Sequence, residues 1–312
     1  MWGSAIKMGE MSNVILTGAS GFVGTALVDK LLARGDKVYA LSRHPPTARE
    51  SLVPLIGDIT EVNLGLANLS EDIASCYHLA AIHRLGEDKD GSIWVTNVKG
   101  TANVIDFCIK HSIPHLFFCS TAYTQGRNTY EQSKAVCEVL VNHSKIPKVT
   151  VFKPSVIMGT EQYPYLGHFS QFVSAVIKIH QRAELIRKRI EGTLRLPILQ
   201  PVFRIRGNPE GKLNLVTVDT VAQAMADIQE EGTFWLTNPN PPMLKELVEW
   251  VGEFILLDFR ILPSFQPTPI EMMFQKMASA FNFYLEGDSF PSDLPACHIT
   301  KEFIHKTLLT VL

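Results

Sequence analysis

Residues 13–24 read Asn-Val-Ile-Leu-Thr-Gly-Ala-Ser-Gly-Phe-Val-Gly, an apolar run followed by three glycines that are three residues apart. The run Asn13–Thr17 is typical of a buried parallel strand. Residues 21–34 carry apolar side chains at helical spacing, which predicts a helix that ends before Gly35. Because Lys37–Ser42 then has the pattern of a second strand, the segment is a strand–helix–strand unit of the usual size.

Strand and helix patterns continue to alternate along the first half of the chain. Further strands are predicted at 52–56, 75–79, 116–119 and 149–152, and helices at 93–110 and 129–142. This alternation predicts an α/β fold, a doubly wound Rossmann sheet of parallel strands with helices on both faces. After Gly159 the pattern changes to a helix at 169–191, a strand and a helix across 213–228, irregular Pro-rich segments from Pro239, and helices at 270–284 and 300–312.

The composition excludes several classes of protein. The 312 residues are 46% hydrophobic and 19% charged with a net charge of −2, so the chain is globular and has no basic excess for nucleic-acid binding. The absence of a long uncharged apolar run argues against a membrane span. Five scattered cysteines without a C-x-x-C pair favour a reducing, cytoplasmic location. Residues 1–11 lack a signal-peptide pattern and are interpreted as a leader outside the fold.

The glycine-rich turn is the first candidate binding site. Glycine permits a tight turn and close approach of a pyrophosphate, and the N–H groups at a helix N-terminus attract anions. A glycine-rich turn without a ligand is the alternative. We expect a dinucleotide to be bound there by Gly18, Ser20, Gly21, Phe22, Val23 and Gly24.

The residues after the second and third strands bear on the choice of cofactor. Enzymes selective for NAD often have an acidic residue after the second strand, whereas this chain has Arg43, with Arg49 further on. A guanidinium binds a 2′-phosphate well, so we expect NADPH or NADP rather than NADH; a solvated arginine is the alternative. Asp58 is expected either to accept a hydrogen bond from adenine or to cap a turn.

A tyrosine and a lysine four residues apart form the third motif. Tyr130 and Lys134 lie on one face of a predicted helix. A nearby ammonium lowers the pKa of a phenol, which makes Tyr130 a usable proton donor. Thr121 follows a strand and is therefore expected at the carboxyl edge of the sheet, where it would orient a carbonyl oxygen. A capping threonine and a half-buried tyrosine are the structural alternatives.

Together these motifs give the chain a family resemblance. It resembles an extended short-chain dehydrogenase/reductase of the epimerase/dehydratase superfamily through TGASGFVG (17–24), GDI (57–59), HLAA (78–81), NVKGT (97–101), CSTA (119–122), YEQSK (130–134) and KPSVIMG (153–159). Within that superfamily it is similar to the thioester-reductase and fatty acyl-CoA reductase branch through residues 57–66, 120–123, 128–141 and 213–225.

The resemblance implies roles for individual residues. It implies that Thr121, Tyr130 and Lys134 form a catalytic triad, that Lys134 also holds the nicotinamide ribose, and that Asn97 supports the sheet. It further implies cofactor contacts from Tyr130 and Lys134 themselves and from Arg43, Asp58, Ile59, Ala80, Ala81, Pro154, Ser155 and Val156. The implied substrate is a small-molecule or carrier-bound carbonyl compound: an acyl thioester, an aldehyde or a ketone. Homodimers, often through the helix with the Tyr and Lys, are common in the family.

The chain also departs from the family pattern. Thr121 and Tyr130 are only nine residues apart, and Lys153 replaces a common arginine. We expect an NADP-binding domain at 12–158, to which 213–238 returns, and a mostly helical substrate cap formed by 159–212 and 239–312. In the cap, 254–262 and a cluster of Met272, Met273, Phe274, Met277 and Phe281 are expected to form either an acyl pocket or ordinary core.

Other functions remain as alternatives. One is a nucleotide-sugar epimerase that retains its cofactor, and another is a non-catalytic NADP-binding sensor or scaffold. No metal site is expected, since Pro114 interrupts any helix between His111 and His115. Cys119 is interpreted as a buried strand thiol rather than a nucleophile.

Overall fold

The computed structural model describes residues 12–67, 69, 71–194 and 202–312, and the chain divides into two compact units. The first unit runs to Ser155 and also includes Val218–Leu236 and Ser292–Leu294. The second unit comprises Val156–Thr217, Thr237–Pro291 and Pro295–Leu312.

A parallel sheet of seven strands forms the centre of the first unit, within the residues described. The strand order is β10-β6-β5-β4-β1-β2-β3, and every pair is parallel. The order reverses between β1 and β4, where sheets of this kind bind ligands at the carboxyl edge. The strands are β1 Asn13–Thr17, β2 Lys37–Ser42, β3 Leu52–Ile56, β4 Ser75–His78, β5 His115–Cys119, β6 Lys148–Phe152 and β10 Gly232–Phe234.

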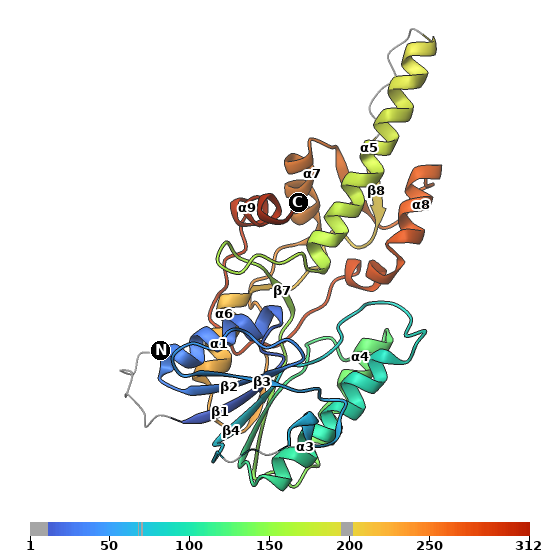
Figure 1. Ribbon diagram of the computed structural model, residues 1–312. Helices are drawn as coiled ribbons and strands as arrows, with labels where there is room; N and C mark the ends of the chain where they lie inside the picture. The colour runs from blue at the N-terminus through green and yellow to red at the C-terminus, as the bar shows by residue number, and fades with distance from the viewer. Residues whose placement is uncertain (1–11, 68, 70, 195–201) are drawn as a thin grey trace. The chain divides into compact units, whose positions relative to one another are not determined.

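Helices cover both faces of this sheet, which confirms the predicted doubly wound fold. Figure 1 shows α1 and α6 against one face and α3 and α4 against the other. The predicted helix at 93–110 is continuous but contains one π-helical turn, η2, between α2 and α3. The elements are α1 Phe22–Arg34, η1 Val62–Gly65, α2 Ser92–Trp94, η2 Val95–Lys99, α3 Gly100–Lys110, α4 Thr129–Asn142 and α6 Val218–Asp227.

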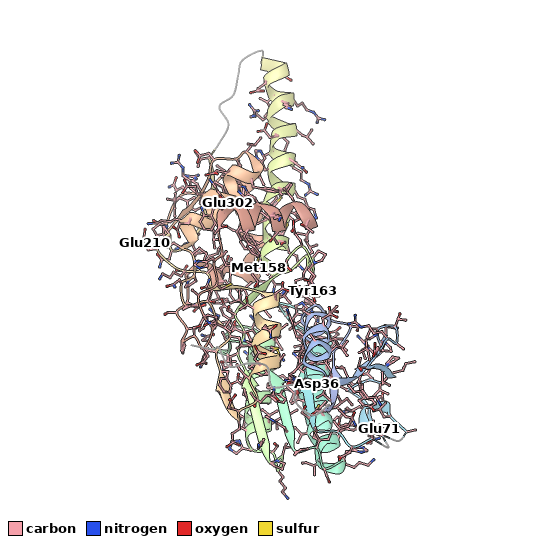
Figure 2. All side chains as sticks on the ribbon, turned by 90° about the vertical axis from the view of Figure 1, so that its left-hand side faces the viewer. Asp36, Glu71, Met158, Tyr163, Glu210 and Glu302 are labelled. Atoms are coloured by element: carbon pink, nitrogen blue, oxygen red, sulfur yellow. The ribbon has the colours of Figure 1, made fainter. Side chains whose placement is uncertain are left out.

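One hydrophobic cluster of the first unit lies between the sheet and the α3–α4 layer. It contains fully buried Ile15 from β1, Leu116 from β5 and Val104 from α3. On the other face, Arg34 at the end of α1 pairs with Asp36, which is labelled in Figure 2, at 2.6 Å. Arg34 also donates to the carbonyl of Ala226, which ties α6 to α1 although they are far apart in sequence.

The second unit is mostly helical, as predicted, and it contains two small parallel pairs of strands. β7 Val156–Met158 pairs with β9 Leu215–Thr217, and β8 Phe203–Arg206 pairs with β11 Phe259–Leu262. The helices are α5 His168–Leu194, α7 Leu244–Ile255, α8 Pro269–Met277, η3 Ser279–Leu285 and α9 Lys301–Val311.

The prediction for the Pro-rich region after Pro239 was wrong in part. Residues 244–255 form the regular helix α7, which buries Leu244, Leu247 and Val251 at helical spacing. The predicted helix at 270–284 is divided, because α8 ends at Met277 and the tighter turns of η3 follow. None of the helices in the described ranges is both long and apolar enough to cross a lipid bilayer.

The turn between β1 and α1 requires glycine for steric reasons. A Cβ built on Gly24 would lie 2.1 Å from the carbonyl oxygen of Gly18, so α1 could not begin so close to the strand if residue 24 had a side chain. Gly18 itself has a φ of +76°, in the left-handed region. The glycine spacing is therefore a condition for this strand–helix packing.

The substitution Gly24→Ala is expected to lower the free energy of unfolding by about 2 kcal/mol or more, because backbone must move to admit the methyl group. Urea unfolding followed by circular dichroism measures this. Gly192→Ala is the control, because a Cβ at this position of α5 meets nothing within 4 Å and alanine favours a helix. Equal stability of the Gly24 variant and the wild type would contradict the steric interpretation.

Candidate functional site

The start of α1 forms an open backbone cradle at the carboxyl edge of the sheet. Gly21 is the N-cap of α1, and no side chain caps this end of the helix. A Cβ on Gly18 would lie 2.7 Å from the backbone nitrogen of Ala80, so the turn and the segment after β4 are in close contact. A helix N-terminus without a side-chain cap suits an anion such as a pyrophosphate. The contacts predicted for Ser20, Phe22 and Val23 stay predictions.

Arg43 and Asp58 lie next to each other at the ends of β2 and β3. The Gly57 N–H donates to the carbonyl of Ser42 at 3.2 Å, which joins the two strand ends. The pKa of Asp58 is lowered, mainly by the backbone N–H of Thr60, with a contribution from the charge of Arg43. Oδ1 of Asp58 accepts from Thr60 N–H at 2.9 Å and from Thr60 Oγ1 at 2.8 Å, so Asp58 does cap a turn.

Ser42 is a candidate that sequence analysis missed. Its hydroxyl is buried and has no hydrogen-bond partner among the described residues. It directly precedes Arg43, which is exposed and forms no ion pair within 4 Å in the described chain. Arg49, by contrast, pairs with Asp29 of α1. The adjacent Ser-Arg sequence was the available signal, since both side chains can bind phosphate oxygens.

Ile59 serves mainly as a core residue. Its side chain is buried, and a Cβ on Gly100 would lie 2.7 Å from its Cδ1. Its carbonyl accepts a 2.8 Å hydrogen bond from Nδ2 of Asn103 in α3. The cofactor contact predicted for Ile59 stays a prediction.

A buried histidine organises the end of β4. His78 bonds through Nδ1 to Oγ1 of Thr17 at 2.7 Å and through Nε2 to Oγ1 of Thr101 at 3.0 Å. Burial, with a smaller effect of the Lys134 charge, lowers the pKa of His78 to about 3, so the imidazole is neutral. The Ala80 N–H donates to the same Thr17 oxygen at 3.3 Å, which holds Ala80, and with it Ala81, beside β1.

Lys134 is a buried cation at the carboxyl edge. Its Nζ donates to the carbonyl of Cys119, the last residue of β5, at 2.6 Å and lies 4.8 Å from the centre of the Phe118 ring. Only 3% of the residue is exposed, and burial lowers the pKa of Lys134. Burial also raises the pKa of the Cys119 thiol.

Tyr130 lies one turn before Lys134 in α4, and this turn is held by side-chain hydrogen bonds. Asn128 caps the helix by accepting from the N–H of Glu131 at 2.9 Å. Oγ of Ser133 donates to the Tyr130 carbonyl at 2.7 Å and accepts from Nδ2 of Asn97 at 2.9 Å. Asn97 therefore connects the η2 turn with the turn of α4 that carries Tyr130.

The short connection between Thr121 and Tyr130 is stabilised by a hydrogen bond and an ion pair. Oγ1 of Thr121 accepts from Tyr123 N–H at 3.2 Å, and the residue is only 6% exposed. The neighbouring Ala122 N–H donates to the carbonyl of Pro154 at 2.8 Å, so the residues after β5 and β6 meet. Arg127 pairs with buried Glu131 at 3.1 Å and closes the turn.

Lys153, at the position where the family commonly has arginine, forms a buried ion pair with α4. Its Nζ contacts the two carboxylate oxygens of Glu138 at 2.6 and 2.9 Å, and Thr124 Oγ1 at 3.2 Å. Ser120 donates its hydroxyl to the same carboxylate. Because Ser120 directly precedes Thr121, this network fixes the loop that carries Thr121 against α4.

The remaining predicted positions follow β6. Pro154 and Ser155 end the first stretch of unit 1, and the buried Ser155 hydroxyl has no partner among the described residues. Val156 begins β7 in the second unit, where its N–H donates to the Asn214 carbonyl at 3.1 Å. The structure thus brings Thr121 and Pro154 together within the first unit.

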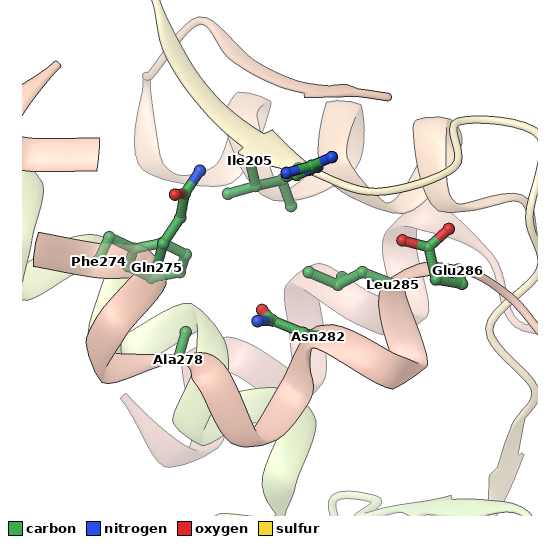
Figure 3. A pocket seen from close by; sticks show the side chains of 8 residues that line it. Ile205, Phe274, Gln275, Ala278, Asn282, Leu285 and Glu286 are labelled. Atoms are coloured by element: carbon green, nitrogen blue, oxygen red, sulfur yellow. The ribbon is translucent and has the colours of Figure 1, made fainter. Parts of the chain in front are cut away.

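The second unit contains a cavity of about 370 Å³ between β8 and the α8–η3 segment (Figure 3). Of the residues expected to form an acyl pocket, Phe274 lines this cavity, whereas Met272, Met273 and Met277 are exposed and Phe281 packs on Phe172. The lining consists of Ile205, Arg206, Phe274, Gln275, Ala278, Asn282, Leu285 and Glu286. In the described residues, no group of three or more His, Cys, Asp or Glu side chains is placed to bind a metal.

Two family models and several curated proteins match parts of this sequence. Residues 15–148 match the 3-beta hydroxysteroid dehydrogenase/isomerase family, and residues 124–225 match the Male sterility protein family. The 2-alkyl-3-oxoalkanoate reductase of Shewanella oneidensis is 28% identical over 183 residues, 48% of this chain and 46% of that protein. A 3 beta-hydroxysteroid dehydrogenase/Delta 5→4-isomerase of Mycobacterium tuberculosis is 27% identical over 194 residues, 62% and 47% of the two chains. The chain thus matches less than half the length of these relatives.

Solved structures with the same fold cover nearly the whole chain. UDP-glucose 4-epimerase of Thermotoga maritima, solved with UDP-glucose, has a TM-score of 0.64 at 16% identity and covers 96% of this chain and 98% of its own. A thiolation-reductase di-domain from an archaeal non-ribosomal peptide synthetase has a TM-score of 0.65 at 15% identity, with 96% and 89% covered. Together with the family matches, these structures confirm the resemblance to extended short-chain dehydrogenases/reductases.

Removing the positive charge of Lys153 is expected to destabilise the fold. Lys153→Met would leave the carboxylate of Glu138 without its buried partner and lower the free energy of unfolding by about 3 kcal/mol. Urea unfolding provides the measurement, with Lys89→Met as the control, because Lys89 pairs at 3.9 Å with fully solvated Glu87. Lys153→Arg is expected to retain most of the stability. Equal stability of Lys153→Met and Lys89→Met would show that the buried pair is not required.

Proposed function

We propose that this member of the extended short-chain dehydrogenase/reductase superfamily is an NADPH-dependent reductase of a carbonyl substrate. The observation that carries the proposal is the position of the buried Lys134 ammonium, which donates to the carbonyl of Cys119 at the carboxyl end of β5. Tyr130 precedes Lys134 by one helical turn in α4, and Thr121 follows Cys119 by two residues. This position of the ammonium supports a site in which Lys134, Tyr130 and Thr121 act together.

The residues at this edge fit a dinucleotide phosphate. The start of α1 suits a pyrophosphate, because its N-cap residue Gly21 makes no side-chain hydrogen bond and the helix N-terminus attracts an anion. The Ser42 hydroxyl, which has no hydrogen-bond partner among the described residues, and the exposed guanidinium of Arg43 suit a 2′-phosphate. Oδ1 of Asp58 is engaged by Thr60. Bound NADPH supplies a hydride.

Thr121, Tyr130 and Lys134 each have a separate role in the proposed reduction. Thr121 presents its hydroxyl to the carbonyl oxygen of the substrate, and Tyr130 donates the proton that this oxygen gains on reduction. The ammonium of Lys134 would stabilise the phenolate that Tyr130 becomes when it gives up its proton. The Cys119 carbonyl holds the ammonium in place, and the cofactor ribose would be its second partner.

The names of the relatives support a carbonyl substrate. One reduces a 3-oxoalkanoate, another acts on a hydroxysteroid, and a structural relative combines a thiolation domain with a reductase. The proposal therefore includes acyl thioesters, aldehydes and ketones, either free or on a carrier. Assays of these compounds with NADPH test the proposal. Turnover of a nucleotide sugar without added cofactor would instead support an epimerase. Binding of NADPH without turnover of any class of compound would support a sensor.

Tyr130→Phe is expected to lower kcat by about 100-fold or more, because the proton donor is lost while the ring remains. The rate is followed by loss of the dihydronicotinamide absorbance. The Kd for NADPH, measured by fluorescence titration, should change less than about two-fold, because the glycine cradle and Arg43 are untouched. Full turnover by this variant with NADPH still bound would overturn the assigned role of Tyr130.

Arg43→Ala is expected to raise the Kd for NADPH about 10- to 100-fold and to leave the Kd for NADH nearly unchanged, because only NADPH carries the 2′-phosphate. Arg49→Ala is the matched control, since Arg49 already pairs with Asp29. Parallel titrations with the two cofactors measure the effect. If Arg43→Ala raises the Kd for NADPH and the Kd for NADH by the same factor, Arg43 does not select between the two cofactors.

A further inference from the structure

The long helix α5 has two halves with different surroundings. In its first half, Val173, Val176 and Ile179 are buried in a hydrophobic cluster of the second unit. From residue 181 to residue 193, by contrast, no residue is buried. Figure 1 shows this second half extending away from the other described elements of the second unit. The second half, about 20 Å long, is therefore a helix surface that is open to a partner.

The acidic side chains of this second half lie on one face and are paired there. Glu184, Arg187 and Glu191 follow one another at intervals of three and four residues, so they share a face of the helix. The Arg187 guanidinium contacts the carboxylate of Glu184 at 2.7 Å and that of Glu191 at 2.8 Å. Because these are the two acids of residues 181–193, no acid of this segment lies on the opposite face.

The opposite face combines cations with aliphatic side chains. Four residues there have the i, i+3, i+4, i+7 spacing of a single helix face: Arg182, Leu185, Ile186 and Arg189. The side chains of Leu185 and Ile186 are exposed, at 70% and 56%. Arg182 and Arg189 are also exposed, and their guanidinium groups form no ion pair with a residue of the described chain. We call these four residues the cationic–aliphatic face.

The charge and shape of this face indicate its partner. Two copies of the chain in contact through the face would bring guanidinium groups together without an acid between them, which is unfavourable. A protein partner would need a groove that matches a single projecting helix, whereas a lipid surface adapts to one. Anionic headgroups attract arginine, and the outer acyl region accepts leucine and isoleucine. The apolar stem of an arginine also lets its charged end stay at the level of the headgroups.

We propose that the second half of α5 binds the surface of a membrane that contains anionic lipid. Leu185 and Ile186 enter the boundary between headgroups and acyl chains, and Arg182 and Arg189 bind headgroup phosphates. The helix lies on the membrane, since none of the described helices is suited to cross one. This inference goes beyond the proposed reductase function and does not depend on it.

Co-sedimentation of the full chain with lipid vesicles tests the proposal. One set of vesicles is phosphatidylcholine with about 30% phosphatidylserine, and the other is phosphatidylcholine alone. Leu185→Gln together with Ile186→Gln removes the aliphatic part of the face, and Leu309→Gln is the control, because Leu309 of α9 is 73% exposed. Arg189→Gln removes a cation from the face, whereas Arg187→Gln removes the same charge from the opposite face of the same helix. Glutamine favours a helix, and circular dichroism verifies that each variant is folded.

The wild type is expected to bind the anionic vesicles and to bind neutral vesicles at least 10-fold more weakly, with binding reduced by added salt (a screening effect of about a Debye length). The aliphatic double variant should lower the partition coefficient about 10-fold or more, and the loss of the cation on the face about five-fold. Each control should change it less than about two-fold, because its side chain lies away from the bilayer.

Three results would overturn the proposal. The first is a wild type that does not bind anionic vesicles, or an aliphatic double variant that binds them as tightly as the wild type. The second is a dimer in light scattering that this double variant dissociates, which would assign the face to a second copy of the chain. The third is retention by polyglutamate without binding to vesicles, which would assign the face to an acidic protein.

Discussion

The hydrogen bond between the Lys134 ammonium and the Cys119 carbonyl is the contact on which the arrangement of the site depends. A buried ammonium without a partner would cost several kcal/mol, so the carbonyl at the end of β5 sets where the helix lies relative to the strand. Tyr130 is carried by the same helix, and Thr121 follows the same strand. This contact therefore links the helix of Tyr130 to the strand that precedes Thr121.

Two further sets of buried polar contacts of the first unit lie at this edge. Thr17, His78 and Thr101 connect β1, β4 and α3, and the Glu138–Lys153 pair connects α4 with the residue after β6. The sheet interior, by contrast, is packed with aliphatic and aromatic side chains such as Ile15 and Phe117. Apolar packing supplies most of the stability of such a sheet, whereas directional contacts at its edge set the positions of individual side chains.

The second unit has a different chemical character. Its cavity combines apolar walls from Ile205, Phe274 and Leu285 with the amides of Gln275 and Asn282 and with two opposite charges at Arg206 and Glu286. The α8–η3 segment also exposes Met272, Met273 and Met277, which are flexible apolar side chains.

The sequence by itself determined the elements that depend on local chemistry. Strand and helix periodicity, the glycine spacing and the Tyr–Lys interval indicated the Rossmann sheet, the β1–α1 turn and the helix of the site, because each depends on residues close together in the chain. Helical spacing of apolar residues was also present in α7, at Leu244, Leu247 and Val251. The prolines on either side of this segment led to the prediction of irregular structure instead. Only the tertiary structure decided that Arg43 adjoins Asp58, that Asn97 holds Ile82 against α4, and that Lys153 pairs with Glu138. These partners come from different strands, helices and loops, and the packing of those elements, which no local pattern encodes, brings them together.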